Sequence, residues 1–293
     1  MDEQQWLAER FEEHRTRLRA VAYRMLGSLS EADDAVQDAW LRVSRADARE
    51  VENLAAWLTT IVARVSLNML RSRKTRREQP LDVHVPDPIV DSTDGTDPEH
   101  EALLADSVGL ALLVVLETLS PPERLAFVLH DMFAMPFEDI APIVERSPDA
   151  TRQLASRARR RVRGTAPLPD SDLTAQWEVV DAFLAASRNG DFDALISVLH
   201  PEVVLRADGG RTGPSREVRG AETVARGALM WSSQVKVTLH RALINGAAGV
   251  VSIRDGRPFS VGAFTVVGGK IVEFDILADP ERLDRLDLTV FMD

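Results

Sequence analysis

The stretch from residue 137 to residue 163 constrains the fold of this chain more than any other. Apolar residues recur at helical spacing over 137–144, and Ser147-Pro148-Asp149 then ends that helix and starts a second one, with Ser147 as N-cap. The second helix has one apolar stripe and is otherwise polar and arginine-rich, with no acidic residue after Asp149. Two such helices joined by a tight turn predict a helix-turn-helix whose second helix enters the major groove of DNA.

A solvated basic helix is the simpler interpretation of such a charge run. A helix that only faces water usually mixes charge signs so that side chains pair at i and i+4, and this one does not. We therefore favour DNA contact. The whole chain has a net charge of −11, with positive charge concentrated at 71–77 and 152–163. This distribution predicts contact with DNA at chosen points, with a larger partner supplying the rest of the affinity.

Length and composition bound the protein class. A chain of 293 residues has room for two or three domains, and the absence of cysteine excludes disulfides, cysteine-ligated zinc and thiol redox sensing. The N-terminal residues are acidic and lack the blocks of a signal peptide. No apolar run approaches the roughly 20 residues that span a bilayer. We expect a soluble cytoplasmic protein that contacts no membrane and has neither a metal site nor a cofactor.

The N-terminal part predicts a small all-helical domain. Amphipathic helices are expected at 3–27, 30–44 and 53–71, the second with Ser30 as N-cap and Asp33 in the capping-box position. An extended acidic linker rich in proline and aspartate follows. A second helical module then has helices at 99–119 and 121–133 ahead of the helix-turn-helix.

The C-terminal part changes to an α+β pattern. Helices are expected at 173–189, 192–199 and 222–230, and short strands rich in valine and isoleucine at 203–207, 234–244, 248–254, 258–267 and 270–277. Asn245-Gly246 is one of several hairpin signals between the strands, which together predict an antiparallel meander. The expected organisation is multidomain, with two all-α domains and one α+β domain. The predicted boundaries are 1–77, a linker at 78–100, 101–164, a short linker at 165–172, and 173–293.

The first two modules resemble a bacterial RNA polymerase sigma factor of the extracytoplasmic-function (ECF) type. Residues 18–27 and 31–42 resemble conserved regions 2.1 and 2.2 of that family, and region 2.2 docks on the clamp helices of the polymerase β′ subunit. The resemblance implies core RNA polymerase, through its β′ clamp helices and its β subunit, and promoter DNA as partners. It assigns polymerase docking to Asp33, Asp34, Gln37, Asp38 and Arg42.

The remaining sigma regions follow in the family's order. Residues 57–71 resemble regions 2.3 and 2.4, which melt and read the −10 element, and 48–54 fall where the family's loop captures a flipped base. The implied −10 contacts are Asn53, Arg64, Asn68, Arg71, Arg73 and Lys74. Many relatives carry an asparagine at the position of Arg64, so the base preference does not transfer. Trp57 lies on the apolar stripe and is assigned to the core. The helix-turn-helix resembles region 4, the −35 reader, which assigns Arg152, Gln153, Ser156, Arg157 and Arg160 to that element.

The third domain resembles a SnoaL-like domain with the cone-shaped NTF2-like fold, on residues 183–195 and 205–211. Sigma factors with this extension form the ECF41 (SigJ-like) group, in which the extension replaces a separate anti-sigma factor, partly by contacting the linker between the sigma domains. Two C-terminal signatures of that group occur in modified form at 208–211 and 278–283, and the linker signature is kept only at 85–90. The implied regulatory residues are Asp208, Gly209, Gly210, Arg211, Asp279, Pro280 and Leu283.

Catalysis is not expected. The third domain contains His200, His240, Asp208, Asp255 and Asp275, but no pair of groups with assignable acid and base roles, and the aspartate-glycine pairs also suit turns. His84 in the linker is expected to be exposed. A pocket for a small ligand in the third domain stays open, and so does a second function: a one-component regulator in which that domain senses a ligand. Such a regulator would bind DNA tightly without polymerase, whereas a sigma factor alone would bind weakly.

Overall fold

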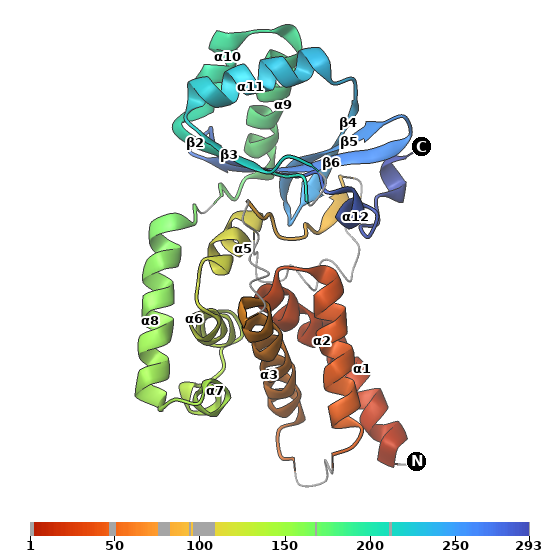
Figure 1. Ribbon diagram of the computed structural model, residues 1–293, viewed down its shortest axis with the longest axis vertical. Helices are drawn as coiled ribbons and strands as arrows, with labels where there is room; N and C mark the ends of the chain where they lie inside the picture. The colour runs from red at the N-terminus through yellow and green to blue at the C-terminus, as the bar shows by residue number, and fades with distance from the viewer. Residues whose placement is uncertain are drawn as a thin grey trace. The chain divides into compact units, whose positions relative to one another are not determined.

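The computed structural model describes residues 3–46, 51–75, 83–93, 95, 109–167, 169–210 and 213–292 (Figure 1). They form two compact units: Met1–Gln79 with Pro98–Asp106 and Val115–Thr165, and Pro80–Asp97 with Ser107–Val114 and Ala166–Asp293. The linker segment 83–95 thus belongs to the same unit as the C-terminal domain. No helix in the described part of the chain is both long and apolar enough to cross a bilayer.

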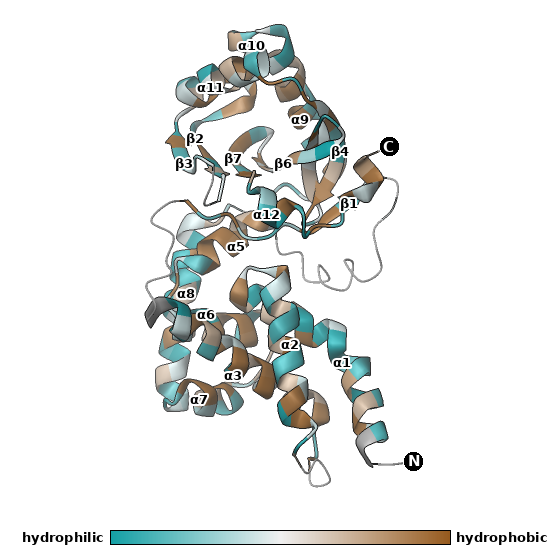
Figure 2. Ribbon diagram, turned by 45° about the vertical axis from the view of Figure 1, so that its right-hand side comes forward, coloured by the Kyte–Doolittle hydropathy of each residue, from teal (hydrophilic) through white to brown (hydrophobic). Residues whose placement is uncertain are grey.

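Three helices, α1 (Glu3–Leu26), α2 (Leu29–Val43) and α3 (Leu54–Thr75), make an antiparallel bundle in the first unit. Its core is formed by apolar stripes, with the Phe11 and Trp40 rings 5.1 Å apart and Leu18, Leu26 and Leu58 fully buried. Figure 2 shows hydrophobic residues along α3 and hydrophilic ones along the visible face of α2.

The predicted start of α2 is wrong by two residues. Ser28, not Ser30, is the N-cap, and its side chain accepts a hydrogen bond from the Glu31 N–H. Asp33 does not complete a capping box, because its carboxylate is engaged by Arg19 of α1 at 2.6 Å. Both serines satisfy the cap preference, so sequence alone does not choose between them.

The helix-turn-helix is formed by α7 (Phe137–Val144) and α8 (Pro148–Thr165). Glu145 ends α7 in the left-handed conformation (φ 58°), and the Ser147 hydroxyl accepts from the Ala150 N–H at 3.2 Å, so Ser147 caps α8 as predicted. Two further helices precede this pair, α5 (Leu110–Glu117) and α6 (Pro121–Phe127), and α6 runs into the π-helical turn η1 (Val128–Met132). The predicted helical residues before 109 lie outside the described residues.

The second unit is built on a seven-stranded sheet in the order β1-β4-β5-β6-β7-β2-β3. Its helices α9 (Leu173–Asn189), α10 (Phe192–Val198) and α11 (Ala221–Gln234) pack on one face, where the rings of Phe183, Phe264 and Phe274 form the core. The strands are β1 (Val90–Ser92), β2 (Leu199–Asp208), β3 (Arg216–Arg219), β4 (Thr238–Ile244), β5 (Ala247–Arg254), β6 (Arg257–Val267) and β7 (Lys270–Leu277), followed by the short helices α12 (Pro280–Leu283) and η2 (Thr289–Phe291).

Two features of this sheet differ from the prediction. Strands β4 to β7 form the expected antiparallel meander, but β2 pairs with β7 in parallel, so the sheet is mixed. A parallel pair requires a long crossover connection, which here contains β3, α11 and the meander. The linker also contributes an edge strand, β1, which pairs with β4. Strand periodicity reports which face is buried but not which strand is the neighbour, so neither feature is visible in the sequence.

Candidate functional site

The residues assigned to polymerase docking share one exposed face of α2. Asp33, Asp34, Gln37, Asp38 and Arg42 are all exposed there, since they stand opposite the buried stripe of Ala32, Ala35, Ala39 and Val43. Leu41 lies between the exposed residues and is itself 47% exposed, so it adds an apolar side chain to this charged face. A mixed acidic and apolar face of this kind is suited to a protein partner. Leu41 was not among the predicted residues.

The residues assigned to the −10 element divide into two groups. Arg64 and Asn68 are exposed, and Arg71 follows one turn later, so the three share one face of α3. Asn53 and Arg73 have structural partners: the Asn53 side chain accepts from the Ala56 N–H at 3.1 Å, and Arg73 forms an ion pair with Glu31 and donates to the Leu26 carbonyl. The Lys74 side chain and residues 47–50 of the base-capture loop lie outside the described residues. Trp57 is half-buried.

The arginines of α8 differ in how firmly they are held. Arg152 pairs with Asp149 and Arg157 with Glu123, while Arg159 pairs with Asp131. Gln153 and Arg160 are exposed and Ser156 is half-buried, and among the described residues none of these three side chains has an ion pair or hydrogen bond. Gln153 and Arg160 lie two turns apart, on the same face of α8. An anion can bind to that face without displacing an ion pair or hydrogen bond of Gln153 or Arg160.

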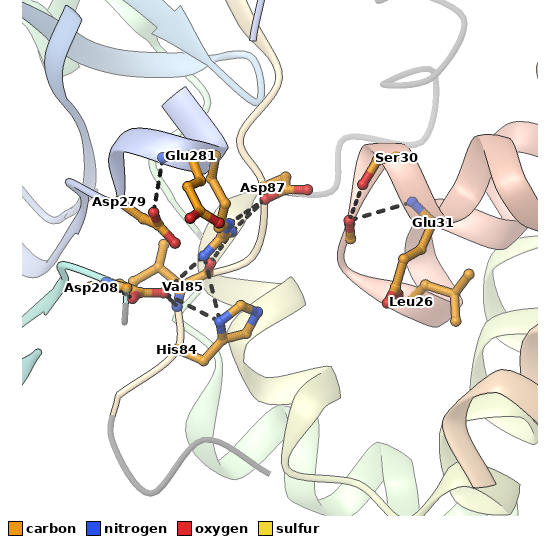
Figure 3. A network of polar contacts seen from close by, with 12 residues as sticks. Leu26, Ser30, Glu31, His84, Val85, Asp87, Asp208, Asp279 and Glu281 are labelled. Carbon is orange, nitrogen blue, oxygen red and sulfur yellow. Dashed lines mark hydrogen bonds and ion pairs between the residues drawn. The ribbon is translucent and has the colours of Figure 1, made fainter. Parts of the chain in front are cut away.

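A second set of charged residues ties the linker to the C-terminal domain, and we call it the linker clasp: His84, Val85, Asp87, Asp208 and Arg282. Figure 3 shows the linker residues beside Asp208. One oxygen of Asp208 accepts from the Val85 N–H at 2.9 Å and from Arg282 Nη1 at 2.8 Å. Arg282 Nε donates to Asp87 Oδ1 at 2.7 Å, and its Nη2 donates to the Val85 carbonyl. Asp208 and Arg282 therefore bind both the backbone of the linker, at Val85, and one of its side chains, Asp87.

The electrostatics of the linker clasp centre on Asp208, whose side chain is 5% exposed. Burial would raise the pKa of this carboxyl, but hydrogen bonds from His84, the Val85 N–H and the Gly210 N–H, with the charge of Arg282, lower the pKa to about 2. Asp208 thus stays ionised at neutral pH. His84 is only 33% exposed, with its Nδ1 3.2 Å from Asp208, so the prediction of an exposed linker histidine is wrong.

The glycine and proline positions of the C-terminal signatures shape the linker clasp. Gly210 has φ +65°, and a Cβ there would lie 2.2 Å from Cγ of Asp279, so only glycine fits. Asp279 in turn caps α12 by accepting from the Glu281 N–H at 3.0 Å, with Pro280 in the first turn and Leu283 buried. These residues fix the helix that carries Arg282. Arg211 lies outside the described residues.

Backbone pairing extends the linker clasp toward β1. The Ile89 N–H donates to the Asn245 side chain at 3.1 Å, and the Asn245 N–H donates back to the Ile89 carbonyl at 2.9 Å. Asn245 has φ 49° in the β4–β5 turn, where the Asn-Gly hairpin was predicted. The turn residue thus has a second role in holding the linker. Asp87, Asn245 and Arg282 were missed as site residues, although Arg282 lies inside the quoted 278–283 signature.

A third charged cluster lies on β2, β3 and β7. The single guanidinium of Arg206 donates to Glu217, Glu273 and Asp275 at 3.1–3.2 Å. The second carboxylate oxygens of Glu273 and Asp275 are buried with no hydrogen-bond partner in the described residues. Burial raises the pKa of Asp275 to about 7; Arg206 opposes this rise, and Glu273 and Glu217 add to it. The domain therefore folds most readily with a proton on Asp275.

Replacing Asp275 by asparagine should remove a pH dependence of stability. Because the folded pKa is raised, the stabilisation by the proton is complete below the ordinary value of 3.8 and is lost as pH rises to about 7. The amide cannot ionise, so its advantage over the wild type should grow across that range by on the order of 1 kcal/mol per pH unit. Urea unfolding with hydrogen exchange at β7 measures this, and the exposed Asp284→Asn is the control. A pH-independent difference would contradict it.

The comparisons with known proteins cover most of the chain. The sigma-70 region 2 model matches residues 10–76 and the sigma-70 region 4 model residues 109–162. The ECF RNA polymerase sigma factor SigJ of Mycobacterium tuberculosis is 38% identical over 286 residues, covering 93% of this chain and 91% of SigJ. The probable ECF sigma factor SigI of the same species is 35% identical, covering 93% of each chain. The crystal structure of SigJ superposes with a TM-score of 0.78 at 36% identity, covering 96% of this chain and 99% of that one.

Proposed function

This chain belongs to the extracytoplasmic-function family of RNA polymerase sigma factors, and on that premise we propose that its C-terminal domain regulates the sigma activity in cis through the linker clasp. As a sigma factor, the protein binds core RNA polymerase and promoter DNA and directs transcription initiation. It is not an enzyme. The protein acts in the cytoplasm beside its polymerase, and its third domain controls that activity.

The sigma surfaces are assigned as follows. The exposed face of α2 docks on the β′ clamp helices, and Leu41 supplies an apolar contact amid its charged neighbours. The face of α3 that carries Arg64, Asn68 and Arg71 contacts the −10 element. The Gln153–Arg160 face of α8 reads the −35 element in the major groove, where arginine and glutamine side chains bond base edges. Arg73 and Asn53 act by holding α3, since their side chains already have partners.

The regulatory proposal rests on the hydrogen bonds that Arg282 and Asp208 form with the Val85 backbone, and on the ion pair between these two side chains. The linker joins the two sigma domains. With residues of the linker between 85 and 92 hydrogen-bonded to the C-terminal domain, the linker must give up these contacts before it can change its path. We propose that the docked linker restrains initiation and that its release permits initiation.

Run-off transcription with core polymerase tests this, on the promoter upstream of the protein's own gene. Full-length protein is compared with a version that ends at Thr165, which lacks the partners of the linker. We expect both to initiate, and the shorter protein to do so faster. If the truncated protein initiates more slowly than the full-length protein, the third domain is required for initiation and does not restrain it. If neither initiates while the isolated protein binds the promoter tightly, the sigma assignments fail and a one-component regulator explains the helix-turn-helix better.

The sequence analysis also left open whether the third domain binds a small ligand. Aromatic rings pack between the helices and the sheet, with Phe264 and Phe274 stacked 4.1 Å apart and Phe183 edge-on to both. Regulation through the linker clasp requires no ligand there. Our proposal therefore includes none.

A further inference from the structure

Arg152 of α8 lies against an aromatic ring of the preceding helix. Its guanidinium is over the ring of Phe137, the first residue of α7, with 5.3 Å between the guanidinium carbon and the ring centroid. Two carboxylates also approach it, Asp149 at 2.7 Å and Glu138 at 4.0 Å. Arg152, which the resemblance to region 4 assigns to the −35 element, thus has both charged and aromatic neighbours.

The Phe137 ring is itself fixed by the segment before it. It stacks on the imidazole of His130 in η1, with ring centroids 3.8 Å apart and 25° between the planes. His130 Nδ1 lies 3.0 Å from the Met135 carbonyl oxygen, which can only accept, so Nδ1 carries the hydrogen of this bond. Phe137 is 8% exposed, so its ring has little freedom to turn away from Arg152. We call His130, Phe137 and Arg152 the α8 stack.

The neighbours of Arg152 respond differently to DNA. The side chains of Asp149 and Glu138 are 87% and 66% exposed, so water and salt weaken their attraction for the guanidinium. A DNA phosphate or the edge of a guanine offers the guanidinium two hydrogen bonds at once, and the phosphate charge also repels both carboxylates. The Phe137 ring is uncharged and attracts the cation through its face. Arg152 can therefore exchange the carboxylates for DNA and keep its contact with the ring.

Arg152 also lies where a recognition helix contacts DNA. Helix α8 begins at Pro148, so Arg152 belongs to its N-terminal part, which is the part of such a helix that reaches base edges. The Arg152 side chain is 53% exposed and is accessible from solvent. A free arginine loses rotamer entropy when a ligand immobilises it, and a side chain that is already oriented loses less. Contact with a fixed ring thus favours DNA binding by Arg152.

We propose that Phe137 is a positioning residue for −35 recognition, which orients the Arg152 guanidinium toward the major groove while His130 supports the ring. The proposal rests on the assignment of α8 to the −35 element. Phe137 is buried and acts only through Arg152. Its ring therefore has a second role beside packing in the core of region 4.

A double-mutant cycle in the full-length protein with core polymerase tests this role. The readout is the −35 ratio, which is the run-off initiation rate on a promoter with the −35 element divided by the rate on one without it. A loss of folded protein lowers both rates and leaves this ratio unchanged. We expect Arg152→Ala to lower the ratio by about tenfold and Phe137→Leu by about fivefold. In the Arg152→Ala protein, Phe137→Leu should lower it no further. Phe137→Tyr keeps the ring and should keep the wild-type ratio.

Phe127→Leu is the matched control. Phe127, on α6, is 8% exposed, as Phe137 is, and no arginine lies over its ring within the described part of the chain. Its replacement removes a ring of the same size from the same domain. It should destabilise region 4 to a similar degree and leave the −35 ratio unchanged.

The outcomes separate the α8 stack from the assigned function. If Phe137→Leu lowers the −35 ratio equally with and without Arg152, the ring acts through packing and the proposal is overturned. If Arg152→Ala leaves the ratio unchanged while Gln153→Ala lowers it, α8 still reads the −35 element but the positioning role fails. If neither lowers it, the assignment of α8 fails as well. Should Phe137→Leu not fold, His130→Ala decides, because His130 is half-buried and its removal leaves the Phe137 ring present. We expect a lower ratio that disappears as an effect in the Arg152→Ala protein, and an unchanged ratio in folded His130→Ala overturns the proposal.

Discussion

Replacing Arg282 by alanine should free the linker from the C-terminal domain and raise the rate of transcription initiation toward that of the protein truncated at Thr165. The Arg282 side chain is 14% exposed and contacts Asp208, Asp87 and the Val85 carbonyl. Its removal deprives the largely buried carboxylates of Asp208 and Asp87 of the guanidinium that they share. Breaking a buried pair in this way costs about 3–5 kcal/mol. The linker avoids that cost by leaving the sheet, because Asp87 then returns to water.

Hydrogen exchange measures this release directly. The amides of Val85 and Ile89 donate to Asp208 and Asn245 in the wild type, so we expect both to be protected. In Arg282→Ala they should exchange about 100-fold faster or more, which corresponds to the lost stabilisation. Arg282→Lys should be intermediate, since lysine keeps the charge but not the planar fork.

Arg285→Ala is the matched control. Arg285 follows the same short helix and is exposed, so its removal should leave both amides protected and initiation unchanged. If Arg282→Ala keeps Val85 and Ile89 protected, the linker is held by β1 pairing alone and the linker clasp has no regulatory role. If the amides open while initiation is unchanged, the linker is released but does not restrain polymerase.

The second large effect on transcription initiation is expected from substitutions on α8. Arg160→Ala and Gln153→Ala should each lower initiation on a promoter with a −35 element by about 10-fold or more, because one good base contact is worth about 1–3 kcal/mol of discrimination. Both side chains are exposed, and no hydrogen bond or ion pair holds either of them within the described part of the chain, so the loss falls on DNA binding. Run-off transcription over a range of salt concentrations is the measurement. Arg160→Ala should also weaken the salt dependence.

Arg159→Ala tests whether α8 acts through specific contacts with DNA or through its net positive charge. Arg159 is one position away but forms an ion pair with Asp131 in η1, so its loss should affect stability more than promoter selectivity. Equal losses for Arg159→Ala and Arg160→Ala would show that α8 acts through net charge. Equal losses on promoters with and without a −35 element would reject the assignment of this helix.

The helices were accessible to prediction because their signals are local. The apolar stripe of α3, the Ser147-Pro148 start of α8 and the Asn245-Gly246 hairpin each depend on residues a few positions apart. The predicted N-cap of α2 was wrong because this local rule is satisfied equally by Ser28 and Ser30. Site residues that belong to short signatures, such as Asp208 and Asp279, were found from their resemblance to a family, not from geometry.

The sequence by itself therefore determined most of the helices and strands, the helix-turn-helix and the family. The tertiary structure alone decided the parallel pairing of β2 with β7, the addition of the linker as a strand and the partners of the charged residues. Arg282 and Val85 are 197 positions apart. No local periodicity reports such contacts, because they depend on which charged groups the fold buries together and which it leaves in water.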